Sequence, residues 1–166
     1  RSLWDTLWAA GQQHGMRPFG MRAMMSLRLD KFFGSWLSEF SPDYTPAETG
    51  MDRFVAFDKE ADFIGRSAAE AERQAGAKRK LAVFEVDADD ADAVGYEPVW
   101  IDGEVKGFCT SGGYSHYAKK SIVLALVDGE SLSDELEADI EILGDMRGAK
   151  RIHRMYFDAD GQRMRG

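Results

Sequence analysis

The class of fold is decided by residues 99–105, which read VWIDGEV. Apolar residues alternate with other residues on both sides of Asp102-Gly103, a dipeptide typical of a two-residue hairpin turn. Successive side chains of a strand point to opposite faces of a sheet. This spacing therefore predicts two antiparallel strands joined by a tight turn.

The same alternation extends outward through the second half of the chain. The apolar residues that recur at this period are Leu81, Val83, Val99, Ile101, Val105, Ile122, Leu124, Leu126, Ile140 and Ile142. Asp128-Gly129 and Gly144-Asp145 mark two later turns. About six short strands within ~90 residues predict a small antiparallel β-barrel with a jelly-roll-like arrangement.

Residues before Gly76 have helical periodicity instead, so the whole chain is predicted to be α+β. We expect helices at about residues 2–10, 20–33 and 65–74, and a short strand at residues 53–57. Ala23, Met24 and Leu27 are expected on the inner side of the second helix. The division near Gly76 predicts two parts, residues 1–76 and residues 77–166.

The first helix begins almost at the first residue and carries large apolar side chains. Ser2 and Asp5 have the spacing of a capping box. The stripe behind it is expected to be buried, and it contains Leu3, Trp4, Leu7 and Trp8. We therefore expect this chain to be a segment of a longer polypeptide.

Composition excludes several classes of function. The 21 Lys and Arg residues against 29 Asp and Glu residues give a net charge of -8, which argues against a nucleic-acid or anionic-membrane surface. No apolar run approaches the roughly 18 to 20 residues of a membrane span. Cys109 is the only cysteine, so internal disulfides and zinc-ligand spacings are excluded. A single cysteine suits a reducing compartment, and we expect the cytoplasm.

Two polar segments could be taken for ligand-binding loops, but each has a simpler interpretation. The acidic run at residues 87–92 lacks the spacing of a calcium loop, because its sixth place holds Asp92 and its twelfth holds Pro98. It is predicted to be a solvated loop, and no metal site is predicted. The glycine-rich residues 110–115 lack the Walker lysine and are interpreted as a turn of the barrel.

Cationic residues beside aromatic ones give the best sign of a binding site. Arg22 and Arg28 lie in the second predicted helix, Trp36 follows it, Arg53 begins the predicted short strand and Lys80 opens the barrel half. An anionic ligand with a flat ring system would use such residues, since cations bind carboxylates and aromatic faces stack on rings. Taken singly, each cation is better explained as solvated surface charge.

Long stretches of the chain resemble a known family. Residues 15–73, 79–127 and 157–166 resemble the aminomethyltransferase domain of sarcosine and dimethylglycine dehydrogenases. The pieces SLRL (26–29), TPAETG (45–50), FIGR (63–66) and TSGG (110–113) resemble the glycine-cleavage T-protein. Together these stretches cover nearly all of the chain in a consistent order.

The resemblance implies a tetrahydrofolate site. Residues 1–76 would be the C-terminal portion of a folate-binding α+β body, and residues 77–166 the C-terminal β-barrel domain. In the parent dehydrogenases a separate FAD domain oxidises an N-methyl amine, and the folate domain transfers the one-carbon unit. The implied partners are folate, a one-carbon donor and the N-terminal part of the same polypeptide, with no nucleic acid or membrane.

The family's folate-contacting positions carry over to three residues of this chain, and a fourth residue departs from the family's pattern. Trp36 matches an aromatic residue against the folate, and Lys80 lies near a basic residue that faces the glutamate tail. Arg22 lies near an arginine of the family ahead of SLRL, although the T-protein's arginine aligns with Met24. Arg53 stands where the T-protein has a tryptophan.

The family's catalytic aspartate and its pterin-binding glutamate match no segment of this chain. No catalytic residue is therefore predicted here, and the 166 residues alone are expected to be inactive. Two alternatives stay open: a stand-alone folate-dependent methyl or aminomethyl transferase or demethylase, and a non-catalytic docking module.

Overall fold

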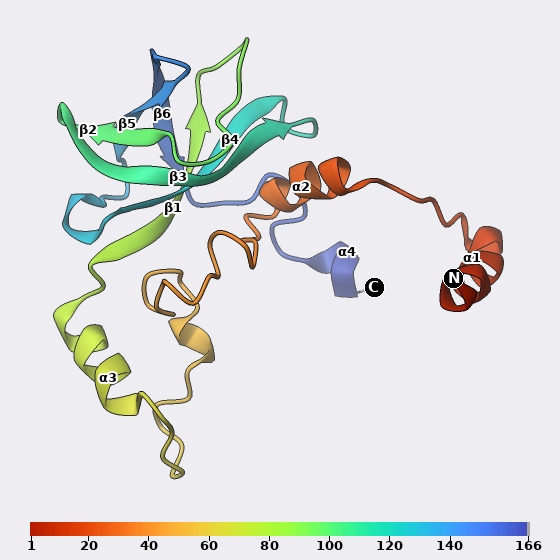
Figure 1. Cartoon of the computed structure of the whole chain (residues 1–166), viewed down its shortest axis with the longest axis horizontal. Coiled ribbons are helices and arrows are strands. Elements are labelled where there is room, and N and C mark those ends of the chain that lie inside the picture. Colours follow the sequence, from red (N-terminus) through yellow and green to blue (C-terminus); the bar gives the residue numbers. More distant parts are fainter. Residues whose placement is uncertain (166) are drawn as a thin grey trace.

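Six antiparallel strands close into a barrel in this computed structural model, which describes residues 1–165. The strands follow the order β1-β4-β3-β2-β5-β6, and β6 pairs with β1 to close the ring (Figure 1). Their bounds are β1 (Arg79–Val86), β2 (Pro98–Ile101), β3 (Glu104–Ser115), β4 (Lys120–Asp128), β5 (Glu137–Ile142) and β6 (Asp145–Ile152). The predicted antiparallel barrel is confirmed.

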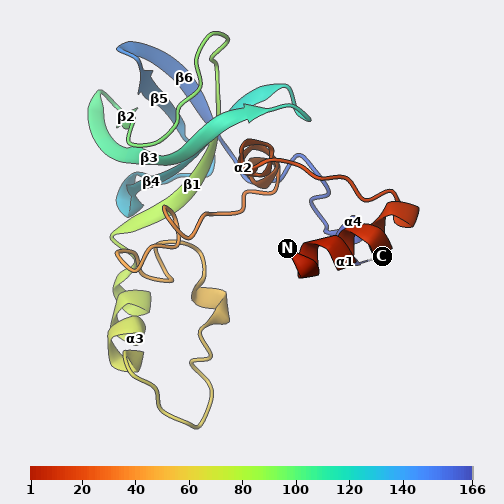
Figure 2. The same ribbon diagram turned by 45° about the vertical axis from the view of Figure 1, so that its right-hand side comes forward.

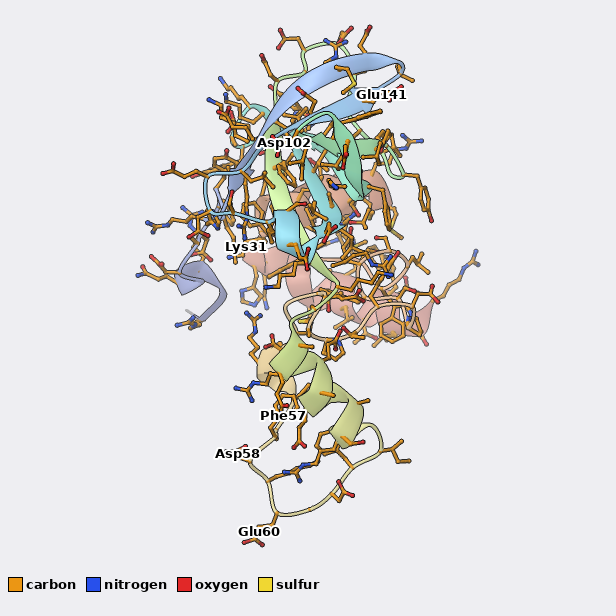
Figure 3. All side chains as sticks on the ribbon, turned by 90° about the vertical axis from the view of Figure 1, so that its left-hand side faces the viewer. Lys31, Phe57, Asp58, Glu60, Asp102 and Glu141 are labelled. Atoms are coloured by element: carbon orange, nitrogen blue, oxygen red, sulfur yellow. The ribbon has the colours of Figure 1, made fainter. Side chains whose placement is uncertain are left out.

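Helices lie outside the barrel, most of them before it in the chain. They are α1 (Ser2–Gly11), α2 (Met21–Asp30), α3 (Arg66–Ala75) and α4 (Gln162–Arg165), with 3-10 turns at Gln12–His14, Asp52–Phe54 and Gly129–Ser131. Helix α2 lies against the barrel, whereas α1 stands apart at the end of an extended linker in both views (Figures 1 and 2). The 57–60 segment projects beside α3, far from Asp102 in its turn and from Glu141 in β5 (Figure 3).

The barrel interior is filled by one face of each strand. Phe84, Val99, Cys109, Val123 and Ile140 are fully buried within it. Alternation within the strands places these residues inward. In β1 and β4 the period-two residues Leu81, Val83, Ile122 and Leu124 belong to the outer cluster instead. The exclusion of their apolar area from water is the main stabilisation of the barrel.

Strand β4 is buried on both faces because α2 and the C-terminal segment cover its outer side. Leu29 of α2 packs on Ile122 and Leu124, and Tyr156 packs on the same outer cluster. This covering explains why residues 122–127 are apolar without alternation, which is typical of a strand with no solvated face.

The predicted hairpin at Asp102-Gly103 is confirmed. Ile101 pairs with Glu104 across the turn, and both central residues have left-handed backbones, with φ of 52° at Asp102 and 78° at Gly103. These signs of φ define the turn whose twist matches that of two paired strands, and glycine adopts them without strain.

Gly103→Ala is expected to lower the free energy of unfolding by about 1–2 kcal/mol, because a Cβ is strained at this φ. No atom would clash with that Cβ, so the cost isolates the backbone conformation. Gly148→Ala, at an ordinary φ in β6 with equally open surroundings, is the control and should change stability by less than about 0.5 kcal/mol. Urea denaturation of both variants measures the difference, and equal midpoints would contradict the interpretation.

Two predictions about the first helix are wrong. Ser2 makes no side-chain cap hydrogen bond, and the helix begins after Arg1. No residue of α1 is buried, and Leu3, Trp4 and Leu7 are all exposed. The stripe exists as a pattern, with Trp4 stacked on Trp8 at 5.8 Å between ring centroids, but nothing in residues 1–165 covers it.

The predicted inner side of the second helix is also wrong. Ala23, Met24 and Leu27 are exposed, whereas Leu29 and Asp30 are buried. Ser26 faces β3 and donates a hydrogen bond to the Tyr114 carbonyl at 2.8 Å. The helix turns partly polar residues toward the barrel because they find hydrogen-bond partners there, which hydrophobic periodicity does not detect.

Residues 53–57 form no strand, contrary to the prediction. A 3-10 turn covers Asp52–Phe54, and Phe57 donates its backbone N–H to the Val55 carbonyl, so the hydrogen bonds are local. The residues have β-forming side chains but no neighbouring strand to pair with. The third helix, predicted at 65–74, is confirmed within one residue as Arg66–Ala75.

The glycine-rich residues 110–115 belong to β3 and not to a turn, so that interpretation is wrong. A register shift between Cys109 and Ser111 marks a bulge in the pairing with β4. A side chain at Gly112 would collide with the Ala93 carbonyl, so glycine is needed for a close approach of two backbones. Within the described residues, no helix is long and apolar enough to cross a membrane.

Candidate functional site

A buried carboxylate, Glu39, organises the loop that follows α2. The Glu39 side chain is fully buried, and one of its oxygens accepts hydrogen bonds from the Ser35 backbone N–H at 2.6 Å and the Ser38 hydroxyl at 2.8 Å. Its other oxygen accepts from the Ser111 hydroxyl of β3. The guanidinium of Arg28, on α2, lies 3.6 Å from the carboxylate.

The electrostatics of this site favour the charged form of Glu39. Burial alone raises the pKa of a carboxyl group, but hydrogen bonds from Ser111, Ser35 and Ser38 outweigh it and lower the pKa of Glu39. Burial lowers the pKa of Arg28, and the adjacent Glu39 opposes that shift. The result is an ion pair that joins the helix, the loop and the barrel.

A second buried carboxylate, Glu48, holds the next loop through a capping box. Glu48 accepts a hydrogen bond from the Thr45 backbone N–H at 3.1 Å, and the Thr45 hydroxyl accepts from the Glu48 N–H at 3.2 Å. This reciprocal pair is the arrangement of a Thr-x-x-Glu sequence. From the sequence, TPAETG (45–50) was noted only for its family resemblance, and this capping box was not predicted.

Glu48 also ties this loop to the first strand of the barrel. Its carboxylate lies 3.2 Å from the Arg79 guanidinium, and its backbone carbonyl accepts from the Leu81 N–H at 2.7 Å. Thr45 donates to Glu72 of α3 at 2.7 Å. The TPAETG piece therefore fixes the positions of α3 and β1 relative to the loop.

The structure places Trp36 on the first of these loops. Its side chain is 73% exposed, and the neighbouring Leu37 is 91% exposed. These two exposed apolar side chains lie next to each other on a loop whose backbone is held by the buried Glu39. Trp36 thus offers both of the properties that stacking requires, an open ring face and a defined position.

Lys80 lies at the start of β1 and lines a cavity of about 160 Å³ between α3 and the 3-10 turn. Arg73 and Phe57 are also in its wall, with the Arg73 guanidinium 5.0 Å from the Phe57 ring centroid. Glu72 and Asp52 line it as well, so the cavity carries both signs of charge.

The four predicted contact residues do not form one cluster. Arg22 is exposed on α2, and Arg53 is exposed on the 3-10 turn with its guanidinium 4.8 Å from the Phe54 ring centroid. Asp52, next to Arg53, lines the cavity of Lys80, but Trp36 and Arg22 are not in its wall. Their roles in binding stay predictions.

The single cysteine is accounted for by packing. Cys109 is fully buried in the barrel, where burial raises the pKa of its thiol, so the prediction of a packing cysteine is confirmed. Across residues 1–165 no group of three His, Cys, Asp or Glu side chains could hold a metal ion.

Sequence reasoning missed Glu39 and Glu48 as organising residues. Both lie within the stretch of family resemblance, and Glu48 is part of TPAETG. The Thr45–Glu48 spacing was a readable signal of a capping box. Glu39 had no such signal, because its partner Ser111 is 72 residues away in sequence.

Two family models together match most of the chain. Residues 1–59 match the GCVT N-terminal domain, and residues 79–158 match the glycine cleavage T-protein C-terminal barrel domain. The chain therefore belongs to the glycine cleavage T-protein family, which confirms the resemblance read from the sequence.

Individual relatives are of two kinds. The chain is 38% identical over 143 residues to mitochondrial dimethylglycine dehydrogenase of Homo sapiens, which covers 86% of this chain and 16% of that protein. It is 34% identical over 156 residues to an aminomethyltransferase of Geobacillus sp. (strain WCH70), which covers 94% of this chain and 43% of that protein. The chain spans less than half the length of either relative.

A solved structure shares the fold. The glycine cleavage system aminomethyltransferase T from Bartonella henselae matches with a TM-score of 0.75 at 20% identity, over 84% of this chain and 39% of that one. This likeness extends to residues outside the barrel, since it covers more of the chain than the barrel alone.

Proposed function

We propose that this chain forms one wall of a tetrahydrofolate site in a longer aminomethyltransferase. The observation that carries the proposal is that Trp36 stays exposed although buried Glu39 fixes the loop on both sides of it. A ring face held open on a rigid backbone suits a flat ligand, because stacking then costs little conformational entropy.

Folate fits the residues of this chain in part. The indole of Trp36 can stack on a ring, and the exposed ammonium of Lys80 can pair with a tail carboxylate. No residue of this chain matches the family's catalytic aspartate or its pterin-binding glutamate. We infer that the remaining wall and the catalytic group come from the N-terminal part of the folate-binding body, and that the 166 residues alone are inactive.

The exposed stripe of α1 supports such a partner. Leu3, Trp4 and Leu7 form an apolar surface that residues 1–165 leave uncovered, and contiguous apolar surface of this kind is typical of an interface. We propose that the N-terminal part of the same polypeptide covers it.

The parent enzyme is proposed to be a flavin-linked dehydrogenase of sarcosine or dimethylglycine, in the cytoplasm. The 38% identity to mitochondrial dimethylglycine dehydrogenase supports the choice of a dehydrogenase, whereas the cytoplasm is proposed from the single cysteine alone. The 34% identity to an aminomethyltransferase favours a stand-alone transferase as the second candidate. A dinucleotide-binding glycine fingerprint ahead of the folate domain would distinguish the dehydrogenase.

Trp36→Ala in the complete enzyme is expected to weaken folate binding by about 1–3 kcal/mol, the usual range for one lost aromatic stack. Leu37→Ala, which removes an equally exposed apolar neighbour, is the matched control and should leave affinity nearly unchanged. Calorimetry with folinic acid measures both. Unchanged affinity in the Trp36 variant would remove that residue from the site, and flavin reduction by the amine should not respond to either change.

Lys80→Ala is expected to cost less, roughly 0.2–1 kcal/mol, because an exposed ion pair is screened by water and salt. Its effect should fade as ionic strength rises, whereas that of Trp36→Ala should persist. Lys78→Ala provides the control for a general change of charge nearby. The role of Lys80 is excluded if both lysine variants bind folate alike at low salt.

A further inference from the structure

A single carboxylate, that of Glu39, holds both ends of the loop that carries Trp36. We call this arrangement the bracket of Glu39. Ser35 and Ser38 stand immediately before and after the exposed pair Trp36 and Leu37, and both donate to the same oxygen of Glu39. The pair is thus carried on a closed loop whose two ends meet at one buried atom. Fixing both ends restricts the backbone of the residues between them.

The other side of the carboxylate fixes this bracket to the rest of the molecule. The second oxygen of Glu39 accepts from Ser111, at the β3 bulge, and Ser38 lies 3.2 Å from Ser111 between hydroxyl oxygens. Arg28 of α2 is 3.6 Å from the carboxylate and also donates to the Phe33 carbonyl at 2.9 Å. These contacts therefore fix the position of the loop relative to both the barrel and α2.

We propose that Glu39 is a positioning residue, which holds the backbone at Trp36 in one orientation relative to the barrel. The expected effect of Glu39 on folate affinity rests on the proposed folate function, but its expected effect on loop order does not. Glu39 itself is fully buried, so the proposal gives it no direct contact with the ligand. The low pKa caused by its hydrogen-bond donors keeps it an acceptor at neutral pH.

The chemistry of the bracket predicts which substitutions break it. Glu39→Met keeps the length of the side chain but removes every acceptor, so Ser35 and Ser38 lose their partner. Glu39→Gln retains one amide oxygen that can accept from both, and its amide N–H can donate to the Ser111 hydroxyl. Gln should therefore preserve the loop and Met should release it.

The proposed effect of Glu39 on loop order is tested by measuring backbone order with ¹⁵N relaxation on this chain. The order parameters of the Trp36 and Leu37 amides should fall from about 0.85 to below about 0.6 in Glu39→Met, and stay near the original value in Glu39→Gln. Ser38→Ala removes only one of the two hydrogen bonds, so its order parameters should be intermediate. It replaces Glu39→Met if that variant fails to fold. Glu104→Gln, at an exposed carboxylate paired with Lys106, is the control. Unchanged order at Trp36 in both Glu39→Met and Ser38→Ala overturns the proposal.

Folate affinity in the complete enzyme tests the second part through a double-mutant cycle. Glu39→Met should weaken binding by about fivefold to a hundredfold, as Trp36→Ala does, and the double variant should lose little more. Additive losses would show that Glu39 acts elsewhere and would overturn its role through Trp36. If loop order falls but neither variant changes affinity, the folate function fails while the positioning role stands.

Discussion

Phe84→Ala is expected to lower the free energy of unfolding by about 3–5 kcal/mol, which is the usual cost of truncating a buried phenylalanine. Phe84 is fully buried in the middle of β1, inside the barrel. Its removal loses the transfer free energy of the ring and leaves a cavity that closed strands cannot collapse to fill.

Phe54→Ala is the matched control, because Phe54 is 70% exposed on the 3-10 turn. Its loss, including the contact with Arg53, should be less than about 1 kcal/mol. Urea denaturation followed by circular dichroism compares the two variants. Similar losses would mean that the barrel interior does not dominate stability.

Glu39→Ala is expected to cost about 3–5 kcal/mol at neutral pH, because it leaves Arg28 and three hydrogen-bond donors without their buried partner. Folding lowers the pKa of Glu39, so its carboxylate stabilises the folded state above the unfolded pKa of about 4.3. That stabilisation is lost as pH falls through the lower folded pKa.

The difference in stability between wild type and Glu39→Ala should therefore shrink steadily as pH falls below about 4. Urea denaturation of both proteins over this range measures it. Glu104→Ala, at an exposed carboxylate, should show only a small difference at neutral pH. A Glu39→Ala difference that stays constant at low pH would show that charge at Glu39 contributes nothing and that only its packing matters.

The losses of stability expected for Phe84→Ala and Glu39→Ala would have different consequences for function. Phe84 stabilises the barrel as a whole, so its truncation should lower the amount of folded protein without changing the geometry of what remains folded. Glu39 connects α2, its following loop and β3. Its replacement should also alter the folded state itself, at the place where we propose that folate stacks.

The barrel was predictable because its signals are local. Alternation at period two shows which residues share a face, and Asp102-Gly103 fixes the register of one hairpin by its own backbone preference. The third helix was predictable for the same reason, since its periodic segment ends at Gly76. The family resemblance also rests on contiguous stretches of the sequence, and the two family models confirm it.

Where a segment depends on a distant partner, local patterns misled. Residues 53–57 have strand-forming side chains but lie beside no strand edge, and α2 turns Leu29 and Asp30 rather than Ala23 and Leu27 toward the barrel. The apolar stripe of α1 was read correctly as a pattern, but burial requires a covering surface that residues 1–165 do not supply.

The antiparallel barrel, its tight hairpin and the family could be predicted from the amino-acid sequence, because each depends on residue order over short distances. The strand order β1-β4-β3-β2-β5-β6 and the bracket of Glu39 around Trp36 are visible only in the folded chain. A buried carboxylate is tolerated only where donors converge on it, and those donors come from α2, the following loop and β3. Their convergence arises when α2 packs on the barrel, so no spacing along the chain records it.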